Sequence, residues 1–408
     1  MANLRFKNDN GEAFDAPDEL TIDDLFEKVT TTNKNGLNRN AITNSAERGL
    51  IPQRSFFDKD IAVEGNTDRY TVIIDGDFVY NPRKSSTAPY GPFNCYTLNE
   101  PGIVSPLYSC LRPKDKRYTP YLIYYFASPA WHSYIYHNGN QGGARHDRVG
   151  MTVDLLEGIP ISLPELDEQK RIVAFLKLND ERITAQTKKV EALEERRRGL
   201  LQQIFSQEIR FSDDDGSSFP DWEDTMLSDI LMERKQNSRG FEEVFSVSVS
   251  KGLVNQIEHM GRSFAASDTS KYKIVTPGDV VYTKSPTGEF KWGIVKQSQI
   301  EKDVIVSPFY GVFIPKSYAF GYLLDAYFSS SVRAHNYLIT QIRKGAKNTI
   351  NISNDFFLDK DICLPTSENE AQKIMFFIEL LNKQIQIDKD KLEVIKEVKK
   401  GLLQQLFV

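Results

Sequence analysis

The feature that most constrains this chain of 408 residues is a seven-residue phrase that it contains twice. The phrase is GLLQQIF at 199–205 and GLLQQLF at 401–407, about 202 residues later. Other stretches match at nearly the same offset: LRFKNDNGEAF at 4–14 with IRFSDDDGSSF at 209–219, RYTVIIDGDFVY at 69–80 with KYKIVTPGDVVY at 271–282, GIVSPLYSCLRPK at 102–114 with VIVSPFYGVFIPK at 304–316, and ISLP at 161–164 with ICLP at 362–365. An offset kept over most of the chain indicates an internal repeat, which decides how the rest of the sequence is interpreted. We therefore predict that the chain consists of two consecutive copies of one unit of about 200 residues.

The first part of each copy has a mixed character. Short runs rich in β-branched and aromatic residues, such as TVIIDGDFVY and VIVSPFYGVFI, are interrupted by glycine and proline, as is typical of strands joined by turns. A more helical piece follows, PYLIYYFAS in the first copy and SYAFGYLLDAYFSS in the second, and its aromatic residues are interpreted as core. The predicted fold class is mixed α/β, with a globular domain in each copy.

The second part of each copy predicts a long helix. Charged and aliphatic residues alternate after Pro164 and Pro365, and an acidic first turn suits the helix dipole. At coiled-coil spacing, seven of ten seam positions are apolar in the first copy and eight of ten in the second, which favours a coiled coil over a globular surface helix. Apart from Ile204 and Leu406, at the last seam position of each helix, the predicted apolar seam consists of Ile172, Leu176, Ile183, Val190, Leu193, Leu200, Ile374, Ile378, Leu381, Ile385, Leu392, Ile395 and Leu402.

Two long helices with matching seams in one chain most simply pack on each other. We predict an antiparallel coiled coil with one globular domain at each end, a pseudo-twofold molecule; the alternative is that each helix pairs with another subunit. The predicted boundaries are a first globular domain at 1–163, a first helix at 164–207, a second globular domain at 208–365 and a second helix at 366–408.

Composition limits the class of protein. The three cysteines, Cys95, Cys110 and Cys363, are far apart and form no CxxC pair, which argues against a disulfide framework or a zinc site and predicts a reducing, cytoplasmic location. No apolar run has the length of a signal peptide core or a membrane span. The net charge of −5 does not itself favour nucleic acid, but a basic groove can lie on an acidic body.

Several motifs together resemble a known family. They are IPISLPELDEQKRI at 159–172, the R-F…G…F lead-in before each domain, the GDFVY and GDVVY strands, and the closing GLLQQ(I/L)F phrases. In order and length the whole chain resembles the specificity (S) subunit of type I restriction–modification systems. The second copy departs from the pattern, because Glu370-Ala371-Gln372 stands where the first has Glu168-Gln169-Lys170, and this weakens the second motif.

The resemblance implies a function without catalysis. Each globular domain would be a target-recognition domain that reads one half of an asymmetric, bipartite site in double-stranded DNA, and the helices would set the spacing between the halves. Two methyltransferase (M) subunits would dock on this chain, and two restriction (R) subunits would complete the complex. S-adenosylmethionine, ATP and Mg would be held by those partners, so no cofactor or metal is expected in this chain. The sequence agrees, because it contains no GxxxxGK(S/T) phosphate-binding loop.

Arginine, lysine, asparagine and glutamine on glycine-rich loops are the usual groups that contact DNA. Such loops occur in both copies at 138–148 and 341–349, at 81–87 and 283–291, and at 31–39 and 234–240. The candidate DNA-binding residues are Lys34, Arg39, Arg83, Lys84, Asn140, Gln141, Arg145, Arg148, Lys284, Lys291, Arg343, Lys344, Lys347 and Asn348. The alternative interpretation of each is a solvated loop residue. Because the copies differ most in these loops, the two domains are expected to read different sequences.

A second hypothesis is an assembly scaffold that binds proteins through two similar heads and a coiled coil. Salt distinguishes the two hypotheses, because DNA recognition weakens steeply as the salt concentration rises, whereas protein scaffolding need not.

Overall fold

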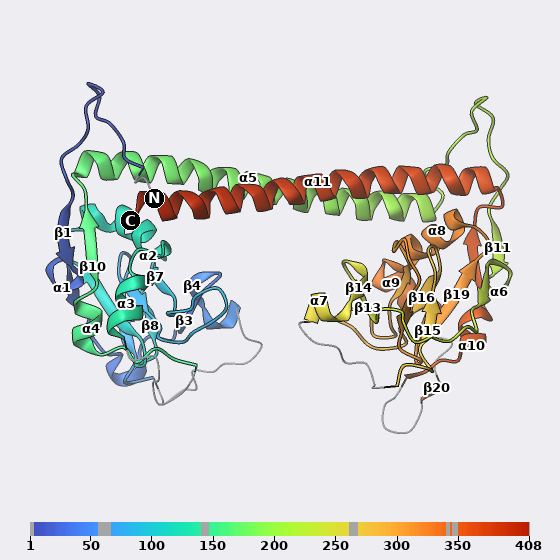
Figure 1. The fold of residues 1–408 in the computed structure, drawn as a ribbon, viewed down its shortest axis with the longest axis horizontal. Coiled ribbons are helices and arrows are strands. Elements are labelled where there is room, and N and C mark those ends of the chain that lie inside the picture. Colours follow the sequence, from blue (N-terminus) through green and yellow to red (C-terminus); the bar gives the residue numbers. More distant parts are fainter. Residues whose placement is uncertain are drawn as a thin grey trace. The chain divides into compact units, whose positions relative to one another are not determined.

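In the computed structural model, each copy of the repeat builds a four-stranded antiparallel sheet (Figure 1). The structure describes residues 4–55, 67–139, 147–260, 268–339, 343–344 and 350–407. In the first copy the sheet consists, in spatial order, of β2 (Phe26–Lys28), β9 (Ser109–Pro113), β6 (Phe78–Tyr80) and β7 (Phe93–Cys95). In the second copy it consists of β12 (Leu231–Glu233), β19 (Gly311–Pro315), β16 (Val280–Tyr282) and β17 (Val295–Gln297). The two sheets therefore have the same topology, as the repeat predicts.

Smaller antiparallel ladders surround each sheet. In the first copy they are β1 (Asp18–Thr21) with β10 (Pro160–Leu163), β3 (Ile42–Ser45) with β4 (Gly49–Pro52), and β5 (Thr71–Ile73) with β8 (Gly102–Val104). Their counterparts are β11 (Glu223–Met226) with β22 (Asp361–Leu364), β13 (Phe245–Ser248) with β14 (Gly252–Asn255), and β15 (Lys273–Val275) with β18 (Val304–Val306). The second copy also contains β20 (Arg343–Lys344) with β21 (Ile350–Asn351).

Short helices complete each globular domain. In the first copy they are α1 (Ile22–Leu25), α2 (Thr119–Ala127), α3 (His132–Asn138) and α4 (Val153–Glu157). In the second copy they are α6 (Leu227–Ile230), α7 (Gln256–Met260), α8 (Tyr318–Phe328), α9 (Ser331–Leu338) and α10 (Asn354–Leu358). The helical interpretation of PYLIYYFAS and SYAFGYLLDAYFSS is confirmed, and Tyr121, Tyr125 and Phe328 are buried in the cores, as expected of their aromatic side chains.

Two long helices follow the globular parts, α5 (Leu166–Phe205) and α11 (Glu368–Leu406). They contain 40 and 39 residues, so each is about 60 Å long at the usual rise of about 1.5 Å per residue. Both begin with acidic residues in the first turn, which is favourable beside the positive end of the helix dipole. After α5 the chain turns at Gln207, whose φ of 62° is the left-handed conformation common at helix ends.

The chain divides into two compact units, and each contains parts of both long helices. Unit 1 comprises Met1–Thr187 and Asp390–Val408, and unit 2 comprises Lys188–Lys389. In unit 1, Ile172 and Leu176 from the start of α5 pack in the same core as Leu403 and Phe407 from the end of α11. The ring of Phe407 lies 5.2 Å from that of Tyr121, measured between centroids.

Unit 2 is built in the same way. Ile374 and Ile378 from the start of α11 share its core with Leu201 and Ile204 from the end of α5. The last turns of a long helix therefore complete the hydrophobic core of each unit. This shared role explains why the GLLQQ sequence occurs in both copies. It also means that Leu201 and Leu403 are buried, whereas the predicted seam residues beside them, Leu200 and Leu402, are only half-buried.

Within unit 2 the two long helices run in opposite directions. Lys189 Nζ lies 2.7 Å from Asp388 Oδ1, and Arg197 Nε donates to Asn382 Oδ1 at 2.5 Å. The residue numbers of the contact partners on α11 fall as those on α5 rise, so these two segments are antiparallel. Seven of the predicted seam residues are buried: Ile172, Leu176, Val190, Ile374, Ile378, Ile385 and Leu392. The others are half-buried: Ile183, Leu193, Leu200, Leu381, Ile395 and Leu402.

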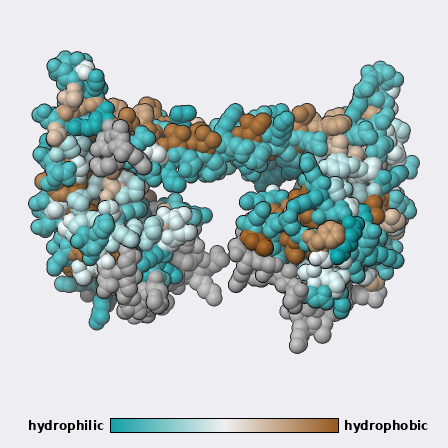
Figure 2. Space-filling model, viewed as in Figure 1, coloured by the Kyte–Doolittle hydropathy of each residue, from teal (hydrophilic) through white to brown (hydrophobic). Residues whose placement is uncertain are grey.

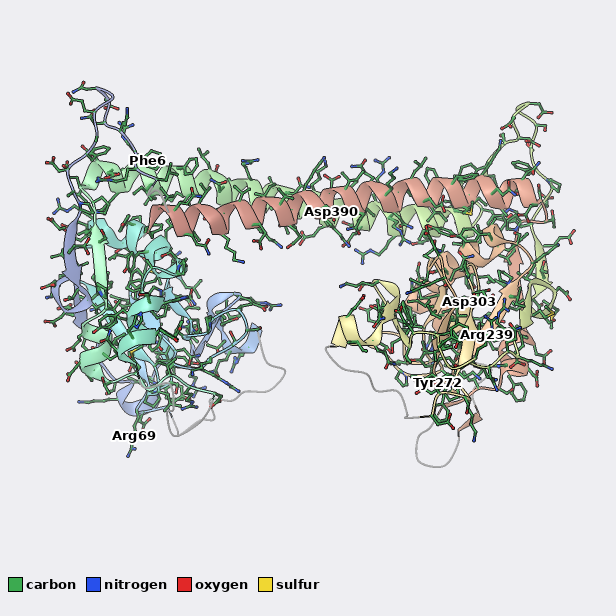
Figure 3. The ribbon with its side chains drawn as sticks, in the orientation of Figure 1. Phe6, Arg69, Arg239, Tyr272, Asp303 and Asp390 are labelled. Atoms are coloured by element: carbon green, nitrogen blue, oxygen red, sulfur yellow. The ribbon has the colours of Figure 1, made fainter. Side chains whose placement is uncertain are left out.

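A buried ion pair ties the lead-in of each copy to the start of its long helix. Arg5 Nε donates to Glu168 Oε1 at 3.1 Å, and Arg210 Nε donates to Glu370 Oε1 at 2.8 Å. Both glutamates are almost fully buried, so each depends on its arginine for charge compensation. The phenylalanine after each arginine packs edge-to-face on the same helix: the pairs are Phe6 (labelled in Figure 3) with Phe175, and Phe211 with Phe377.

Candidate nucleic-acid interface

The GDFVY motif of unit 1 forms a turn held by a buried aspartate. Gly76 has a φ of 89°, a left-handed conformation that glycine adopts without strain. Asp77 Oδ2 accepts the backbone N–H of Ile74 at 2.8 Å, and its carboxylate receives two hydrogen bonds from Arg112, at 2.7 and 2.9 Å. This turn fixes the start of β6, and the predicted DNA-binding loop 81–87 begins where β6 ends.

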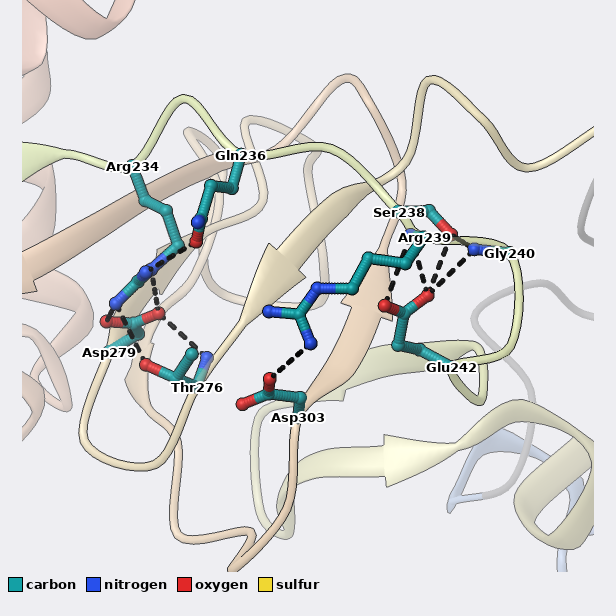
Figure 4. A network of polar contacts seen from close by, with 9 residues as sticks. All are labelled: Arg234, Gln236, Ser238, Arg239, Gly240, Glu242, Thr276, Asp279 and Asp303. Carbon is teal, nitrogen blue, oxygen red and sulfur yellow. Dashed lines mark hydrogen bonds and ion pairs between the residues drawn. The ribbon is translucent and has the colours of Figure 1, made fainter.

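Unit 2 repeats the turn with an arginine from a different place. Asp279 Oδ2 accepts the N–H of Thr276 at 2.8 Å, and Arg234 donates to the carboxylate at 2.6 and 3.0 Å (Figure 4). Arg234 follows β12, whereas the arginine of unit 1 lies in β9. In the same loop, Arg239 lies 3.4 Å from Asp303 (Figure 4). Both arginines of the predicted DNA-binding loop 234–240 are thus engaged by carboxylates of unit 2, which the sequence did not reveal.

The structure brings two of the predicted loops of unit 1 together. The backbone N–H of Lys84 donates to the carbonyl of Asp147 at 2.8 Å, and the N–H of Val149 donates to that of Pro82 at 2.9 Å. Arg83 and Arg148 therefore stand opposite each other in an isolated antiparallel bridge. The Arg83 side chain is 70% exposed and lies 3.7 Å from the Asp147 carboxylate, so it can still contact a ligand in solvent.

A cleft of about 520 Å³ opens beside this bridge. Besides Arg83, Arg148 and one carboxylate, that of Glu47, hydroxyl and amide side chains line it, among them Thr43, Asn44, Ser45, Asn81, Ser85, Ser86 and Thr87. The floor is rigid, because the buried Asn44 donates from Nδ2 to the carbonyl of Val79 at 2.7 Å and accepts from Asn94 at 2.6 Å. Two arginines and many neutral donors and acceptors, against one carboxylate, suit an anionic, hydrogen-bonding ligand. Loop chemistry identified the arginines from sequence, but the residues of β3 and its turn were missed because their proximity depends on packing.

The corresponding loop of unit 2 has a different character. Lys284 has a φ of 56° and is half-buried. Burial lowers the pKa of its ammonium group, while the carboxylates of Glu233 and Asp355 act in the opposite direction. Lys291, by contrast, is exposed. In this unit the exposed cation of the predicted pair is therefore Lys291.

The remaining candidates fall into three groups. Lys34 and Arg39 are exposed; Lys34 begins a short 3-10 turn (Lys34–Gly36) and Arg39 follows it. The buried Asn33 precedes this turn, and its side chain accepts the N–H of Asn38 at 3.0 Å. Arg343 and Lys344 form β20, opposite Asn351 and Ile350. Outside the described residues lie Asn140, Gln141, Arg145, Lys347 and Asn348.

The described part of the chain shows neither a metal site nor a membrane span. Among the described residues, no group of three or more histidine, cysteine, aspartate or glutamate side chains is placed to hold a metal ion. Within the same ranges, no helix combines the length and the apolar character needed to cross a membrane.

Part of this chain is similar in sequence to a known family, and its fold is similar to that of solved structures. Residues 19–195 match the family described as Type I restriction modification DNA specificity domain, and no curated protein matches the sequence. A solved structure concerned with complex assembly and conformational transition of the type I R-M system is 13% identical, with a TM-score of 0.54, covering 96% of this chain and 97% of that chain. This likeness shows a common fold.

Two further structures are similar over nearly their whole length. The S subunit of a type I system from M. genitalium is 13% identical, covering 100% of this chain and 99% of its own, with a TM-score of 0.48. The HsdS subunit from Thermoanaerobacter tengcongensis is 14% identical, covering 96% of each chain, with a TM-score of 0.45. In sequence, residues 19–195 of this chain are therefore similar to the type I restriction modification DNA specificity domain.

Proposed function

We propose that this chain is a DNA sequence-specificity subunit that reads a bipartite DNA site, with one half assigned to the globular domain of each unit. The observation that carries the proposal is the contrast between a shared framework and different loops. The two sheets have one topology, whereas the loop after β6 presents Arg83, with Arg148 of another loop opposite it, and the loop after β16 presents Lys291. Different donors in the corresponding loops of one framework are what two unlike half-sites require.

The proposal includes the long helices as a spacer. An antiparallel coiled coil of α5 and α11, with pseudo-twofold symmetry, would set the number of unread base pairs between the halves. The antiparallel contacts inside unit 2 support this arrangement. So does Asp388, a fully buried carboxylate in the seam that accepts from Lys189 and from Gln384 Nε2 at 2.6 Å, because a buried polar group in a seam favours one register.

Partner subunits form the next part of the proposal. Two methyltransferase subunits would hold S-adenosylmethionine, and two restriction subunits would hold ATP and Mg, in a cytoplasmic complex where this chain performs no catalysis. Apolar side chains exposed on the long helices support docking there (Figure 2). On α11 they recur at steps of four and seven, which places them on one helix face: Phe376, Leu380, Ile387, Val394 and Val398.

Methylation by the assembled complex tests the proposal. Sequencing of methylated adenine should reveal a split, asymmetric motif only where this chain is present. Arg83→Ala should weaken or relax recognition in one half alone, by about fivefold to 100-fold, the usual range for losing a base or phosphate contact. The matched control is Arg117→Ala, whose side chain is similarly exposed at 68% and also pairs with an aspartate, Asp115. The absence of any split motif from an intact complex would refute the proposal.

A further inference from the structure

A tight turn recurs between β8 and β9 in unit 1 and between β18 and β19 in unit 2. Its sequence is Ser-Pro-Leu-Tyr at 105–108 and Ser-Pro-Phe-Tyr at 307–310. In both turns the N–H of the fourth residue donates to the carbonyl of the first at 3.0 Å. The serine hydroxyl also accepts the N–H of the third residue, at 3.3 Å from Leu107 and 3.4 Å from Phe309. Serine first and proline second are the residues that such a turn prefers, so the turn itself explains them.

The fold does not explain the third residue of this turn. Tyr108 and Tyr310, in the fourth position, pack against the hydrophobic cores of their units. Leu107 and Phe309 instead project into solvent and are 58% and 79% exposed. A single exposed apolar side chain is common on protein surfaces. Here, however, both copies of the repeat expose a large apolar side chain at the same position, where a polar residue would form the turn equally well.

In unit 1 the surroundings of this side chain point to its ligand. Leu107 lines the same cleft as Arg83 and Arg148. An apolar side chain and two arginines in one cleft match the edge of a DNA duplex, where phosphates and guanine accept hydrogen bonds and the thymine methyl group or an exposed base face accepts apolar contact.

We infer that Leu107 and Phe309 are base-contacting residues that determine specificity, each for one half of the DNA site. The inference rests on the proposed function and extends it, because the polar loops alone would make no contact with the apolar groups of the bases. Leucine is shaped to contact a thymine methyl group, and phenylalanine can also lie against a base face. The two heads would therefore differ in apolar as well as polar readout.

The test uses Leu107→Ala and Phe309→Ala in the assembled methyltransferase complex. Methylation rates are measured on duplexes that carry every single-base substitution in both half-sites. Each variant should lose about tenfold in rate at one or two base positions of a single half-site, the loss being different for the two variants. Leu107→Met, which keeps an apolar side chain of similar volume, should retain most of the rate. The controls are Val153→Ala in unit 1 and Val332→Ala in unit 2, which remove exposed apolar side chains elsewhere (52% and 66% exposed) and should change no position.

Unchanged rates for both alanine variants on every duplex would overturn the inference while leaving the proposed function intact. An equal loss over both half-sites would also overturn it, because it would indicate a role in assembly rather than in reading. If the wild-type complex discriminates no split site, the proposed function fails together with the inference.

Discussion

The two units make the same stabilising contacts, in part with residues at different positions. Tyr80 donates to the carbonyl of Tyr90 at 2.7 Å, and Tyr282 donates to that of Trp292 at 2.6 Å, so this contact is kept. The buried turn aspartate is also kept, yet its arginine comes from β9 in unit 1 and from the residue after β12 in unit 2. A buried carboxylate needs a compensating charge, but any neighbouring strand can supply it. Burial therefore preserves the interaction rather than the position of both partners.

At the start of the long helix, one contact is kept in both units and another is made in unit 1 alone. In unit 1, Gln169 Nε2 donates to the carbonyl of Pro164 at 2.6 Å, and Ala371 of unit 2 cannot make this bond. The adjacent glutamate nevertheless keeps its arginine in both units. The departure in the second motif thus removes one hydrogen bond and leaves the ion pair between lead-in and helix unchanged.

The largest effect is expected from the glycine that packs under each candidate DNA-binding loop. An alanine Cβ at Gly91 (φ 86°) would lie 2.1 Å from the carbonyl oxygen of Asn81, and at Gly293 (φ 102°) it would lie 2.8 Å from the backbone nitrogen of Lys284. Strain and overpacking together should lower the free energy of unfolding by about 4 kcal/mol for Gly91→Ala and about 2 kcal/mol for Gly293→Ala. Chemical denaturation of the chain, with hydrogen exchange to assign the unit, measures both.

The control for this pair is Gly11→Ala, where φ is 81° but no atom lies within 4 Å of the new Cβ. It should cost only about 1 kcal/mol, the backbone strain alone. Equal losses at all three glycines would show that the close approach beneath the loops does not matter.

A smaller, symmetric effect is expected at the lead-in ion pairs. Arg5→Ala leaves the carboxylate of Glu168 buried without its partner, and Arg210→Ala does the same to Glu370. Each should destabilise its own unit by about 3 kcal/mol, the typical cost of an uncompensated buried charge. Hydrogen exchange of the residues before each domain should report the loss in one unit at a time. Arg117→Ala, at an exposed ion pair, should cost under about 1 kcal/mol; a comparable loss there would contradict the assignment.

The smallest effect concerns the cysteines. Burial raises the pKa of the Cys95 and Cys110 thiols, both in unit 1, to about 12, and it also raises that of Cys363 in unit 2. A higher pKa leaves less of the reactive thiolate at a given pH, so alkylation of the folded chain should accelerate between pH 7 and 9. Mass spectrometry should find the fully buried Cys110 labelled roughly tenfold more slowly than the half-buried Cys363. Similar rates would mean that the core of unit 1 opens readily.

Sequence pattern predicted the regular parts of this protein well. A repeat offset kept over most of the chain implies two copies of one fold, and the structure has matching sheets. A pattern of 40 residues without proline is sufficient for α5, since helical periodicity is local. The strand within GDFVY could likewise be predicted from the local sequence. The candidate DNA-binding loops could be chosen only by residue type, because their contacts join residues far apart in the sequence.

Tertiary packing settled the rest. It placed Arg83 opposite Arg148, 65 positions along the chain, and it turned the arginines of 234–240 toward carboxylates of their own unit. It also directed the ends of the long helices into the cores, so that Leu201 and Leu403 are buried rather than the predicted Leu200 and Leu402. Periodicity records which face of a helix is apolar, and the surface that this face meets exists only after the domains have folded. Local pattern therefore specified the elements, and long-range packing specified their partners.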